Sequence, residues 1–199
     1  IAPDLSDAEL YSIADVVRTV GIDGIIVTNT SVMRPESLKD HKHGSETGGL
    51  SGQPLFSRSN EVLKKLYLYT NGSVPLIGVG GIMRTIDVYE KILCGASLVQ
   101  VYTGLVFNGP VLMKRMLREL GQHSEKDGFK TLQEAVGFKV REEYRIGLLQ
   151  DGMTPEEAEL LHIFEINKII SQTFNCPIFV FLLYHLLCIS SLLLIKKKV

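Results

Sequence analysis

The chain has 199 residues, a formal net charge of -1 and 22% charged residues. This length allows one domain with a real hydrophobic core. A near-neutral charge gives no electrostatic footprint for nucleic acid, so we expect no nucleic-acid partner. The three cysteines, Cys94, Cys176 and Cys188, show neither metal-ligand spacing nor an even-numbered disulfide framework, which favours reduced thiols in an intracellular or matrix-facing compartment.

The first predicted element is a helix over residues 5 to 21. Ser6 and Glu9 have the S-x-x-E spacing of a capping box, in which a hydroxyl and a carboxylate satisfy free backbone N–H groups. Apolar residues then recur at helical spacing as far as Gly21, which predicts a left-handed stop. The residues before this helix resemble the end of a strand that runs into a loop, so we interpret Ile1 as a point of truncation.

Short apolar strands then alternate with helices. The run from Gly24 to Thr28 predicts a strand buried on both faces, as in a parallel sheet. The further predicted elements are, in chain order, a helix at about 59 to 71, a strand from Val74 to Val79, a helix at about 86 to 94 with Thr85 as its N-cap, a strand from Ser97 to Tyr102, and a helix from Pro110 to Gly121. This alternation indicates βαβ units and therefore an α/β fold with a parallel sheet. Three or four units are too few to close a sheet of eight strands, so they fit either half of a (β/α)8 barrel or part of an open doubly wound sheet.

Beyond Gly121 the pattern changes to that of added helices. Thr131 with Glu134, and Thr154 with Glu157, again have the spacing of a capping box, so each pair predicts the start of a helix.

The end of the chain is apolar. Residues 177 to 195 contain no charged side chain, and three lysines follow directly. Nineteen residues are enough to span the hydrocarbon core of a bilayer, and terminal lysines are the usual flank on a cytoplasm-like side. The pattern fits a C-terminal membrane anchor, and it equally fits a foreign tail such as a translated intron or a mis-joined exon.

Two glycines follow one of the predicted strands, in the sequence IGVGGI. Gly80 and Gly81 let the backbone turn its N–H groups toward an anion, with no Cβ in the way. The next strand ends in Tyr102 and Thr103. Two consecutive strands that end in small or hydroxyl residues match the phosphate site of a (β/α)8 barrel, although two glycines also suit an ordinary strand-to-helix turn.

Polar residues also follow the strand nearest the N-terminus. Thr28, Asn29 and Thr30 are placed to contact a polar ligand, and an asparagine can donate and accept hydrogen bonds at once. Loop capping by Asn and Thr is the alternative. The segment SETGGLSGQPL, which includes Gly52, can approach a phosphate closely or can act as a flexible connector.

Five motifs occur together in a recognisable order. They are IAPDL, GIDGIIVTNT, SETGGLSG, PLIGVGGI and GASLVQVYTGL. In this order they closely resemble the C-terminal half of the quinone-reducing, membrane-linked (class 2) dihydroorotate dehydrogenases, and the resemblance covers roughly residues 1 to 138. SETGGLSG is more typical of that class than of the soluble classes.

The resemblance implies a (β/α)8 barrel that holds FMN at the C-terminal ends of its strands. It also implies oxidation of dihydroorotate to orotate in pyrimidine biosynthesis, with electrons passed to ubiquinone at the mitochondrial inner membrane. The barrel part expected from it covers residues 1 to 138. The residues beyond add a helical region over 139 to 172 and an apolar tail over 173 to 199, and this tail has no counterpart in the family pattern, which normally ends soon after Ala135 to Gly137.

The resemblance also implies roles for individual residues. Asn29 and Thr30 match orotate ligands. The positions that match FMN contacts, most of them around its phosphate, are Thr28, Gly52, Gly80, Gly81, Tyr102 and Thr103. Tyr102, Val106 and Pro110 match residues near the quinone tunnel.

Several departures from the family pattern limit these roles. Val106 stands where a threonine is familiar, and Arg84 replaces a residue that is usually small or polar. The catalytic serine, several orotate-binding asparagines and a flavin-contacting lysine are expected upstream of Ile1, so no residue of this chain is named as the general base. We therefore expect the fragment alone to be inactive.

Two other hypotheses remain open at this stage. One is a membrane-tethered, catalytically inactive half barrel. The other is a different FMN-binding or phosphate-binding barrel oxidoreductase. We expect no metal site, because His41 and His43 in a polar loop have no carboxylate or cysteine paired with them in the sequence.

Overall fold

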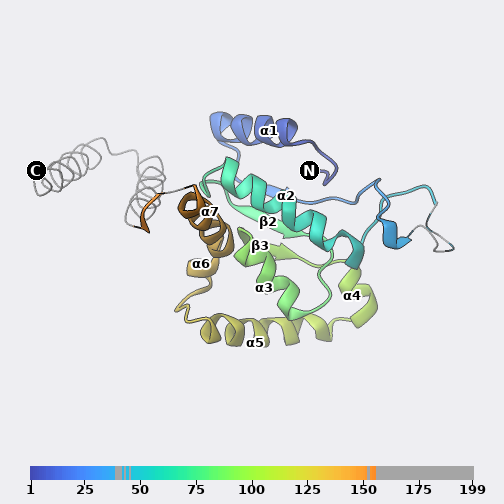
Figure 1. The fold of residues 1–199 in the computed structure, drawn as a ribbon. Coiled ribbons are helices and arrows are strands. Elements are labelled where there is room, and N and C mark those ends of the chain that lie inside the picture. Colours follow the sequence, from blue (N-terminus) through green and yellow to red (C-terminus); the bar gives the residue numbers. More distant parts are fainter. Residues whose placement is uncertain (39–41, 43, 45, 152, 156–199) are drawn as a thin grey trace, which may run out of the picture. The chain divides into compact units, whose positions relative to one another are not determined.

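The computed structural model describes residues 1–38, 42, 44, 46–151 and 153–155 (Figure 1). The chain forms two compact units, Ile1–Gly147 and Leu148–Val199, and the first contains the sheet and every residue for which a ligand is predicted. The predicted tail over 173 to 199, the helix start at Thr154 with Glu157, and both histidines of the polar loop lie wholly or partly outside the described residues.

The first helix, α1 (Asp7–Val20), has the predicted ends. The Ser6 hydroxyl accepts a hydrogen bond from the Glu9 backbone N–H at 3.4 Å, and the Glu9 carboxylate accepts one from the Ser6 N–H at 2.8 Å. Gly21 closes the helix in the left-handed region with a φ of 78°. The predicted capping box and glycine stop are both confirmed.

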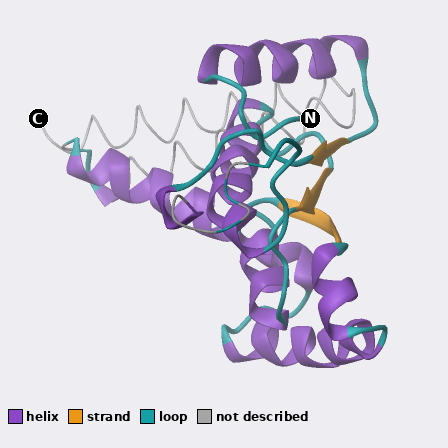
Figure 2. Ribbon diagram, turned by 90° about the vertical axis from the view of Figure 1, so that its right-hand side faces the viewer, coloured by secondary structure: helices purple, strands orange, loops and turns teal. Residues whose placement is uncertain are grey.

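Three parallel strands form one sheet in the order β1 (Ile25–Val27), β2 (Leu76–Val79) and β3 (Ala96–Gln100) (Figure 2). In this register Ile25 lies opposite Leu76, which lies opposite Ala96. Helix α2 (Phe56–Tyr69) comes before β2, and helix α3 (Thr85–Leu93) connects β2 to β3. The predicted α/β class with a parallel sheet is confirmed.

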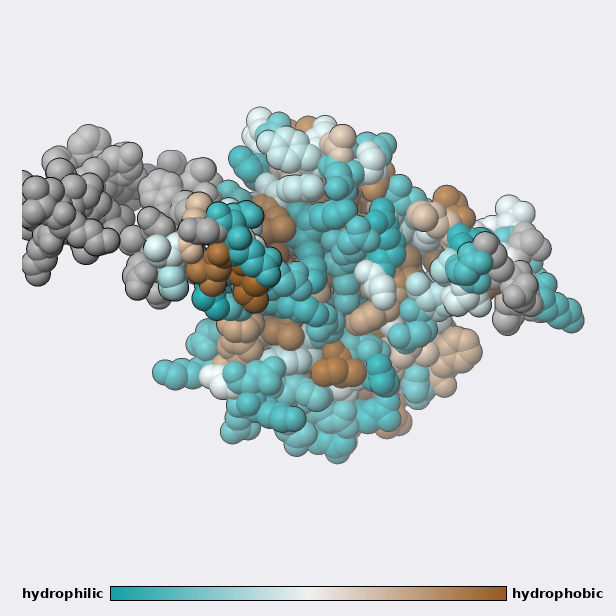
Figure 3. Space-filling view, in the orientation of Figure 1, coloured by the Kyte–Doolittle hydropathy of each residue, from teal (hydrophilic) through white to brown (hydrophobic). Residues whose placement is uncertain are grey.

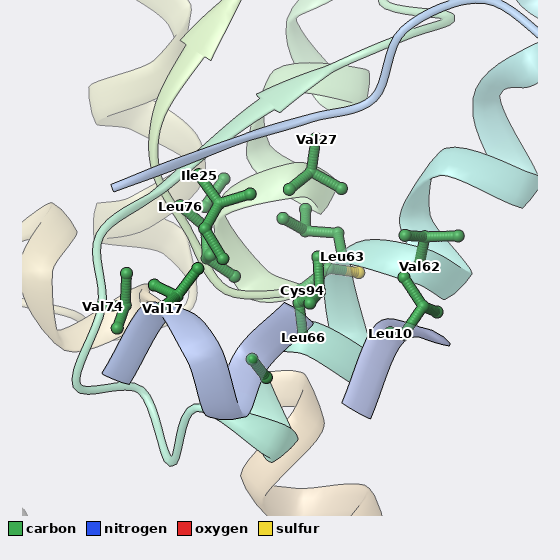
Figure 4. Close-up of a cluster of buried hydrophobic side chains, with 12 residues drawn as sticks. Leu10, Val17, Ile25, Val27, Val62, Leu63, Leu66, Val74, Leu76 and Cys94 are labelled. Atoms are coloured by element: carbon green, nitrogen blue, oxygen red, sulfur yellow. The ribbon is translucent and has the colours of Figure 1, made fainter. Parts of the chain in front are cut away.

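Two clusters of buried side chains hold the fold together. The first lies between α1, α2 and the sheet, where Leu10 of α1 lies beside Val62 of α2, and Val17 of α1 lies beside Val74 (Figure 4). The second joins α3 to α5 (Val111–Lys126) and to the short helix α6 (Leu132–Ala135). Its members are Ile82, Val88, Tyr89, Ile92, Leu112, Met116, Leu120 and Ala135.

The prediction that the strands are buried on both faces is wrong for the described residues. Ile26 is 48% exposed and Leu98 is 63% exposed. The residue between them in register, Ile77, is half-buried. Because successive side chains of a strand point to opposite faces, these residues form one apolar row across the uncovered face of the sheet.

Some helix boundaries differ from the predicted ones. Helix α2 begins at Phe56, three residues before the predicted start at 59. Helix α5 continues five residues past Gly121, because Leu120 and Ser124 are buried on either side of that glycine and packing outweighs its low helix propensity. The six-residue helix α4 (Thr103–Asn108) was not predicted.

Two predicted caps also differ. Thr85 is the first residue of α3 rather than its N-cap. The Asp87 carboxylate supplies the cap instead, because it accepts hydrogen bonds from the backbone N–H groups of Met83 and Arg84 at 3.0 and 2.9 Å. Thr131 does precede α6, but its side chain makes no cap bond. The Glu134 carboxylate accepts from the Lys130 N–H at 2.9 Å.

The remaining elements are short or lie near the C-terminal end of the described chain. Two 3-10 helices, Glu36–Leu38 and Gln53–Leu55, lie in the segment between β1 and α2. Helix α7 (Phe138–Gln150) follows α6. None of the helices within the described part of the chain is both long and apolar enough to cross a membrane.

Cys94 is fully buried in the first cluster, and this burial should make it unreactive. Burial, and secondarily the Glu90 carboxylate, raise the pKa of the thiol from 9.0 to about 12. Since the thiolate is the nucleophile, we expect alkylation of Cys94 by iodoacetamide at pH 8 to be about 1,000-fold slower in the folded protein than after unfolding. Mass spectrometry of the peptide that contains Cys94 measures this rate, and equal rates in both states would contradict the placement of this side chain.

Candidate active site

A cavity of about 310 Å³ opens at the C-terminal ends of the three strands. Each strand contributes the residues that follow it, and the segment before α2 completes the wall. The lining residues are Thr28, Asn29, Thr30, Ser51, Gly52, Leu55, Val79, Gly80, Gly81, Ile82, Gln100, Val101, Tyr102, Thr103 and Gly104. The structure therefore brings together all eight positions for which an orotate or FMN contact was expected.

The Gly80–Gly81 turn is a cradle that only glycine can form. Gly81 has a φ of +76°, and a Cβ on it would lie 2.4 to 2.6 Å from the Cβ, Cα and backbone N of Phe56. Phe56 is the first residue of α2, so this turn lies against the N-terminus of a fourteen-residue helix. A glycine turn beside the positive end of a helix dipole favours a bound anion.

The segment before α2 meets the end of β3 on the other side of this cradle. The Thr103 hydroxyl donates to the Ser51 hydroxyl oxygen at 3.3 Å. Gly52 has a φ of +77°, and a Cβ on it would lie 3.1 Å from the Thr103 side chain. Hydroxyl groups and tightly turned backbone thus line the cavity close to one another, which suits the oxygens of a phosphate.

Thr28 offers the cavity a hydrogen-bonding group that the protein itself leaves unsatisfied. Its side chain is 3% exposed, and among the described residues its Oγ1 is the one buried side-chain polar atom without a hydrogen-bond partner. A buried hydroxyl without a partner costs about 1–3 kcal/mol, so a ligand or an ordered water that accepts from it or donates to it is favoured at this point of the cavity.

Asn29 and Thr30 lie at the exposed mouth of the same cavity. The Asn29 side-chain oxygen accepts a hydrogen bond from the Thr30 N–H at 2.8 Å, and the Asn29 N–H donates to the Ile1 carbonyl at 2.8 Å. The Thr30 side chain packs against Gly49, where a Cβ would come within 2.0 Å of its Oγ1. Both side chains are therefore oriented by the surrounding backbone.

Two charged residues that sequence reasoning missed hold this region in place. Asp4 accepts hydrogen bonds from the Ser31 hydroxyl at 2.5 Å and from the Val32 N–H at 2.8 Å. Arg34 donates to the Glu46 carbonyl at 2.9 Å and to the Gly48 carbonyl at 2.6 Å. A single arginine in a polar loop carries no sequence signal for such a role, whereas Asp4 lies within the IAPDL motif and Ser51, also missed, lies within SETGGLSG.

The three residues expected near a quinone tunnel are all exposed and lie four residues apart along α4 and its two ends, where the Val106 N–H donates to the Tyr102 carbonyl at 3.1 Å. Tyr102 lines the cavity but is 78% exposed, and Val106 on α4 is 70% exposed and does not line it. Pro110 is the N-cap of α5. Figure 3 shows brown and tan side chains at the surface in the region of α4, where Phe107 is also largely exposed.

Arg84 does not line the cavity. Its guanidinium lies 3.2 Å from the Asp87 carboxylate, and its side chain is 68% exposed. The charge that departs from the family pattern is therefore paired at the start of α3 rather than directed at the glycine cradle.

Comparison with known proteins decides the family. The family model described as dihydroorotate dehydrogenase matches residues 1–123, which is more than half of the chain. The chain belongs to the dihydroorotate dehydrogenase family. The matched range contains all the strands and the whole cavity, so the resemblance drawn from the five motifs is confirmed.

Curated members of this family from bacteria, plants and animals are similar to the chain. A dihydroorotate dehydrogenase (quinone) from Azorhizobium caulinodans is 49% identical over 141 residues, which cover 71% of this chain and 39% of that protein. The mitochondrial dihydroorotate dehydrogenases (quinone) of mouse and Arabidopsis thaliana are 48% and 47% identical, over 71% and 69% of this chain and 35% and 30% of their own lengths.

Solved structures give the same assignment. The DHODH of Eimeria tenella in complex with ferulenol is 45% identical with a TM-score of 0.66, and the match covers 69% of this chain and 36% of that one. Its ligand-free form gives a TM-score of 0.67. The chain thus spans between 30% and 39% of the length of these dihydroorotate dehydrogenases.

Proposed function

We propose that this chain forms the phosphate side and part of the substrate side of an FMN-dependent dihydroorotate dehydrogenase that passes electrons to ubiquinone. The observation that carries the proposal is the cavity at the strand ends, which combines a glycine cradle with the unpartnered buried Thr28 hydroxyl. The family assignment and the relatives named as quinone enzymes support the same chemistry.

The residues present fit FMN. Gly80, Gly81 and Gly52 leave space where a Cβ would otherwise stand, and backbone N–H groups in such turns bind a phosphate without a lysine in contact. Thr103 adds a hydroxyl, and Thr28 offers the flavin a hydrogen-bonding group that the protein leaves unsatisfied. When bound, FMN would carry out the hydride transfer and the electron transfer, and the protein would hold the flavin in position for them.

Asn29 and Thr30 are proposed to orient orotate and dihydroorotate. An asparagine side chain can donate and accept at once, as the amides and carboxylate of such a ring require. Since their backbone contacts hold both residues at the cavity mouth, they can place the substrate beside the flavin without moving first. We assign the role of general base to no residue of this chain.

The three-stranded sheet is proposed to be part of a (β/α)8 barrel over residues 1 to 138. In such a barrel the row of Ile26, Ile77 and Leu98 would face the filled interior, which explains why apolar side chains stand on the uncovered face. The proposal also includes an added helical region over 139 to 172 and an apolar tail over 173 to 199 that is either a membrane anchor or a foreign sequence. Tyr102, Val106 and Pro110 are proposed to lie near the quinone, and the complete enzyme is proposed to reside at the mitochondrial inner membrane.

The full-length protein should show this activity directly. We expect it to purify yellow and to release FMN on denaturation. Anaerobic dihydroorotate should bleach its visible absorbance, and a soluble ubiquinone analogue should restore it. A flavoprotein that dihydroorotate does not bleach would contradict the proposed substrate.

The open face of the sheet favours one alternative for the chain on its own. Half a barrel with an exposed apolar row lacks the remaining walls of the cavity and should be inactive or should associate. In the same experiment the chain alone should therefore bind little flavin. Stoichiometric flavin with dihydroorotate–quinone activity in the chain alone would contradict the half-barrel interpretation.

A different FMN barrel oxidoreductase is disfavoured, because the family model covers the whole cavity.

A further inference from the structure

Lys91 is a fully buried lysine that the proposed chemistry leaves without a role. It lies on α3 with 0% of its surface exposed. Its ammonium group donates hydrogen bonds to Ser59 Oγ and Asn60 Oδ1, both at 2.7 Å, and lies 5.3 Å from the centre of the Phe56 ring. All three partners belong to the first two turns of α2, the helix whose N-terminus lies against the glycine cradle.

No carboxylate within the described ranges forms an ion pair with Lys91. The nearest acidic side chains on the same helix are engaged elsewhere, because Asp87 pairs with Arg84 and Glu90 pairs with Lys139. A buried ammonium with only neutral partners is expensive to hold, so a charge in this place needs a compensating anion nearby.

A chain of hydrogen bonds links Lys91 to the cradle. Ser59 Oγ, which accepts from Lys91, has one hydrogen and shares it between two carbonyl oxygens, that of Phe56 at 2.9 Å and that of Gly80 at 3.2 Å. The Lys91 stem also lies close under β2, where a Cβ on Gly78 would be 2.8 Å from Lys91 Cδ. Lys91 therefore supports the cradle from behind, on the side away from the cavity.

We propose that Lys91 is a positioning residue for the FMN phosphate. Through Ser59 it fixes the Gly80 carbonyl, and with it the direction of the N–H groups of the Gly80–Gly81 turn. Its buried positive charge at the same time favours a dianion over a neutral group in the cavity. The inference rests on the proposed function, since it assumes that the anion is the phosphate of FMN.

The protonation state of Lys91 agrees with this role. Burial lowers the pKa of its ammonium to about 8, while Cys94, Asp87 and Glu90 oppose that shift. The group is therefore still mostly charged at pH 7, and a phosphate dianion in the cavity would raise its pKa again.

The test compares FMN with riboflavin, which carries the same ring without the phosphate. Full-length apoprotein is titrated with each flavin and the quenching of flavin fluorescence is measured. We expect Lys91→Met to weaken FMN binding by roughly 10-fold to 100-fold and to change riboflavin binding by less than about 2-fold. Lys114→Met, which removes an exposed lysine of α5, should change neither affinity and serves as the matched control.

Two further variants separate the charge from the hydrogen-bond chain. Lys91→Arg keeps the charge and should retain part of the preference for FMN. Ser59→Ala breaks the link to Gly80 and should lose part of that preference while the charge remains. If Lys91→Met does not fold, these two variants decide the question, and an unchanged preference for FMN in Ser59→Ala overturns the proposal.

Other outcomes are equally decisive. An equal loss of both flavins in Lys91→Met would show a merely structural lysine and overturn the proposal. Unchanged FMN affinity in that variant would do the same, while leaving the proposed function intact. Wild-type protein that binds no FMN would contradict the proposed function together with this inference.

Discussion

Replacing Gly81 with alanine is expected to destabilise the protein by about 2–5 kcal/mol and to abolish FMN binding at micromolar concentrations. Two effects add up. A φ of +76° is unfavourable for any residue with a Cβ and costs roughly 1–2 kcal/mol. The new Cβ would also lie within 2.6 Å of the backbone N of Phe56, and a crowded interior costs about 1–3 kcal/mol more.

Gly21→Ala provides the matched control for this prediction. Gly21 has nearly the same φ, +78°, but a Cβ on it would meet nothing within 4 Å. Its replacement should cost only the backbone part, roughly 1–2 kcal/mol. Urea unfolding of both variants measures the difference. Equal losses would mean that the close approach of α2 to the cradle does not exist.

The loss of FMN follows from the same contact. The clashing atoms belong to the first residue of α2, so relief of the clash moves the helix N-terminus and the glycine turn apart. The anion site consists of those two elements together. Gly21 is 60 residues away from Gly81 in the sequence, at the end of α1, so the Gly21→Ala variant should still bind FMN. A flavin titration of the purified apoprotein measures this binding.

Gly49→Ala should weaken orotate binding by roughly 10-fold or more while FMN remains bound. A Cβ on Gly49 would lie 2.0 Å from Thr30 Oγ1 and 2.5 Å from Thr30 Cβ. The threonine must therefore move out of the position in which it is proposed to hold the substrate. Gly49 does not line the cavity, so the cofactor side should be unaffected.

The neighbouring glycine serves as the control. Gly48 has a φ of +138° and nothing within 4 Å of a Cβ, so Gly48→Ala strains the same loop without touching Thr30. The oxidised holoprotein of each variant is titrated with orotate, and the change in flavin absorbance gives the orotate affinity of Gly49→Ala and of Gly48→Ala. The proposed role of Thr30 would be refuted if Gly49→Ala bound orotate as tightly as Gly48→Ala does.

The elements that were predicted well depend on local chemistry. Ser6 and Glu9 lie three residues apart, so their cap could be foreseen from spacing alone. The polar residues after each strand were also foreseeable, because the C-terminal ends of parallel strands meet at one edge. The cavity lining of Thr28, Gly81 and Thr103 follows from that rule.

The elements that were missed depend on contacts between distant segments. Ile26 and Leu98 belong to strands whose sequences are as apolar as those of strands buried on both faces. Whether their side chains are covered depends on the chain segments that face that side of the sheet, and the strand sequence does not reveal this. Lys91 gives no sign of its burial, since a lysine after a glutamate on an amphipathic helix is normally solvated. The low helix propensity of glycine predicts a stop at Gly121, and propensity alone does not reveal that Leu120 and Ser124 on either side are packed.

Arg34 has a consequence for the thermodynamics of substrate binding. Its guanidinium donates to carbonyls at both ends of one long connection: those of Ser31, Val32 and Met33 on one side, and those of Glu46 and Gly48 on the other. It thus acts as a non-covalent cross-link between the segment that carries Thr30 and the one that leads to Gly52. The conformational entropy of these two segments is lost when the protein folds rather than when a ligand binds. Less of the free energy of the ligand contacts is then offset by ordering of the loop, so the binding free energy is more favourable.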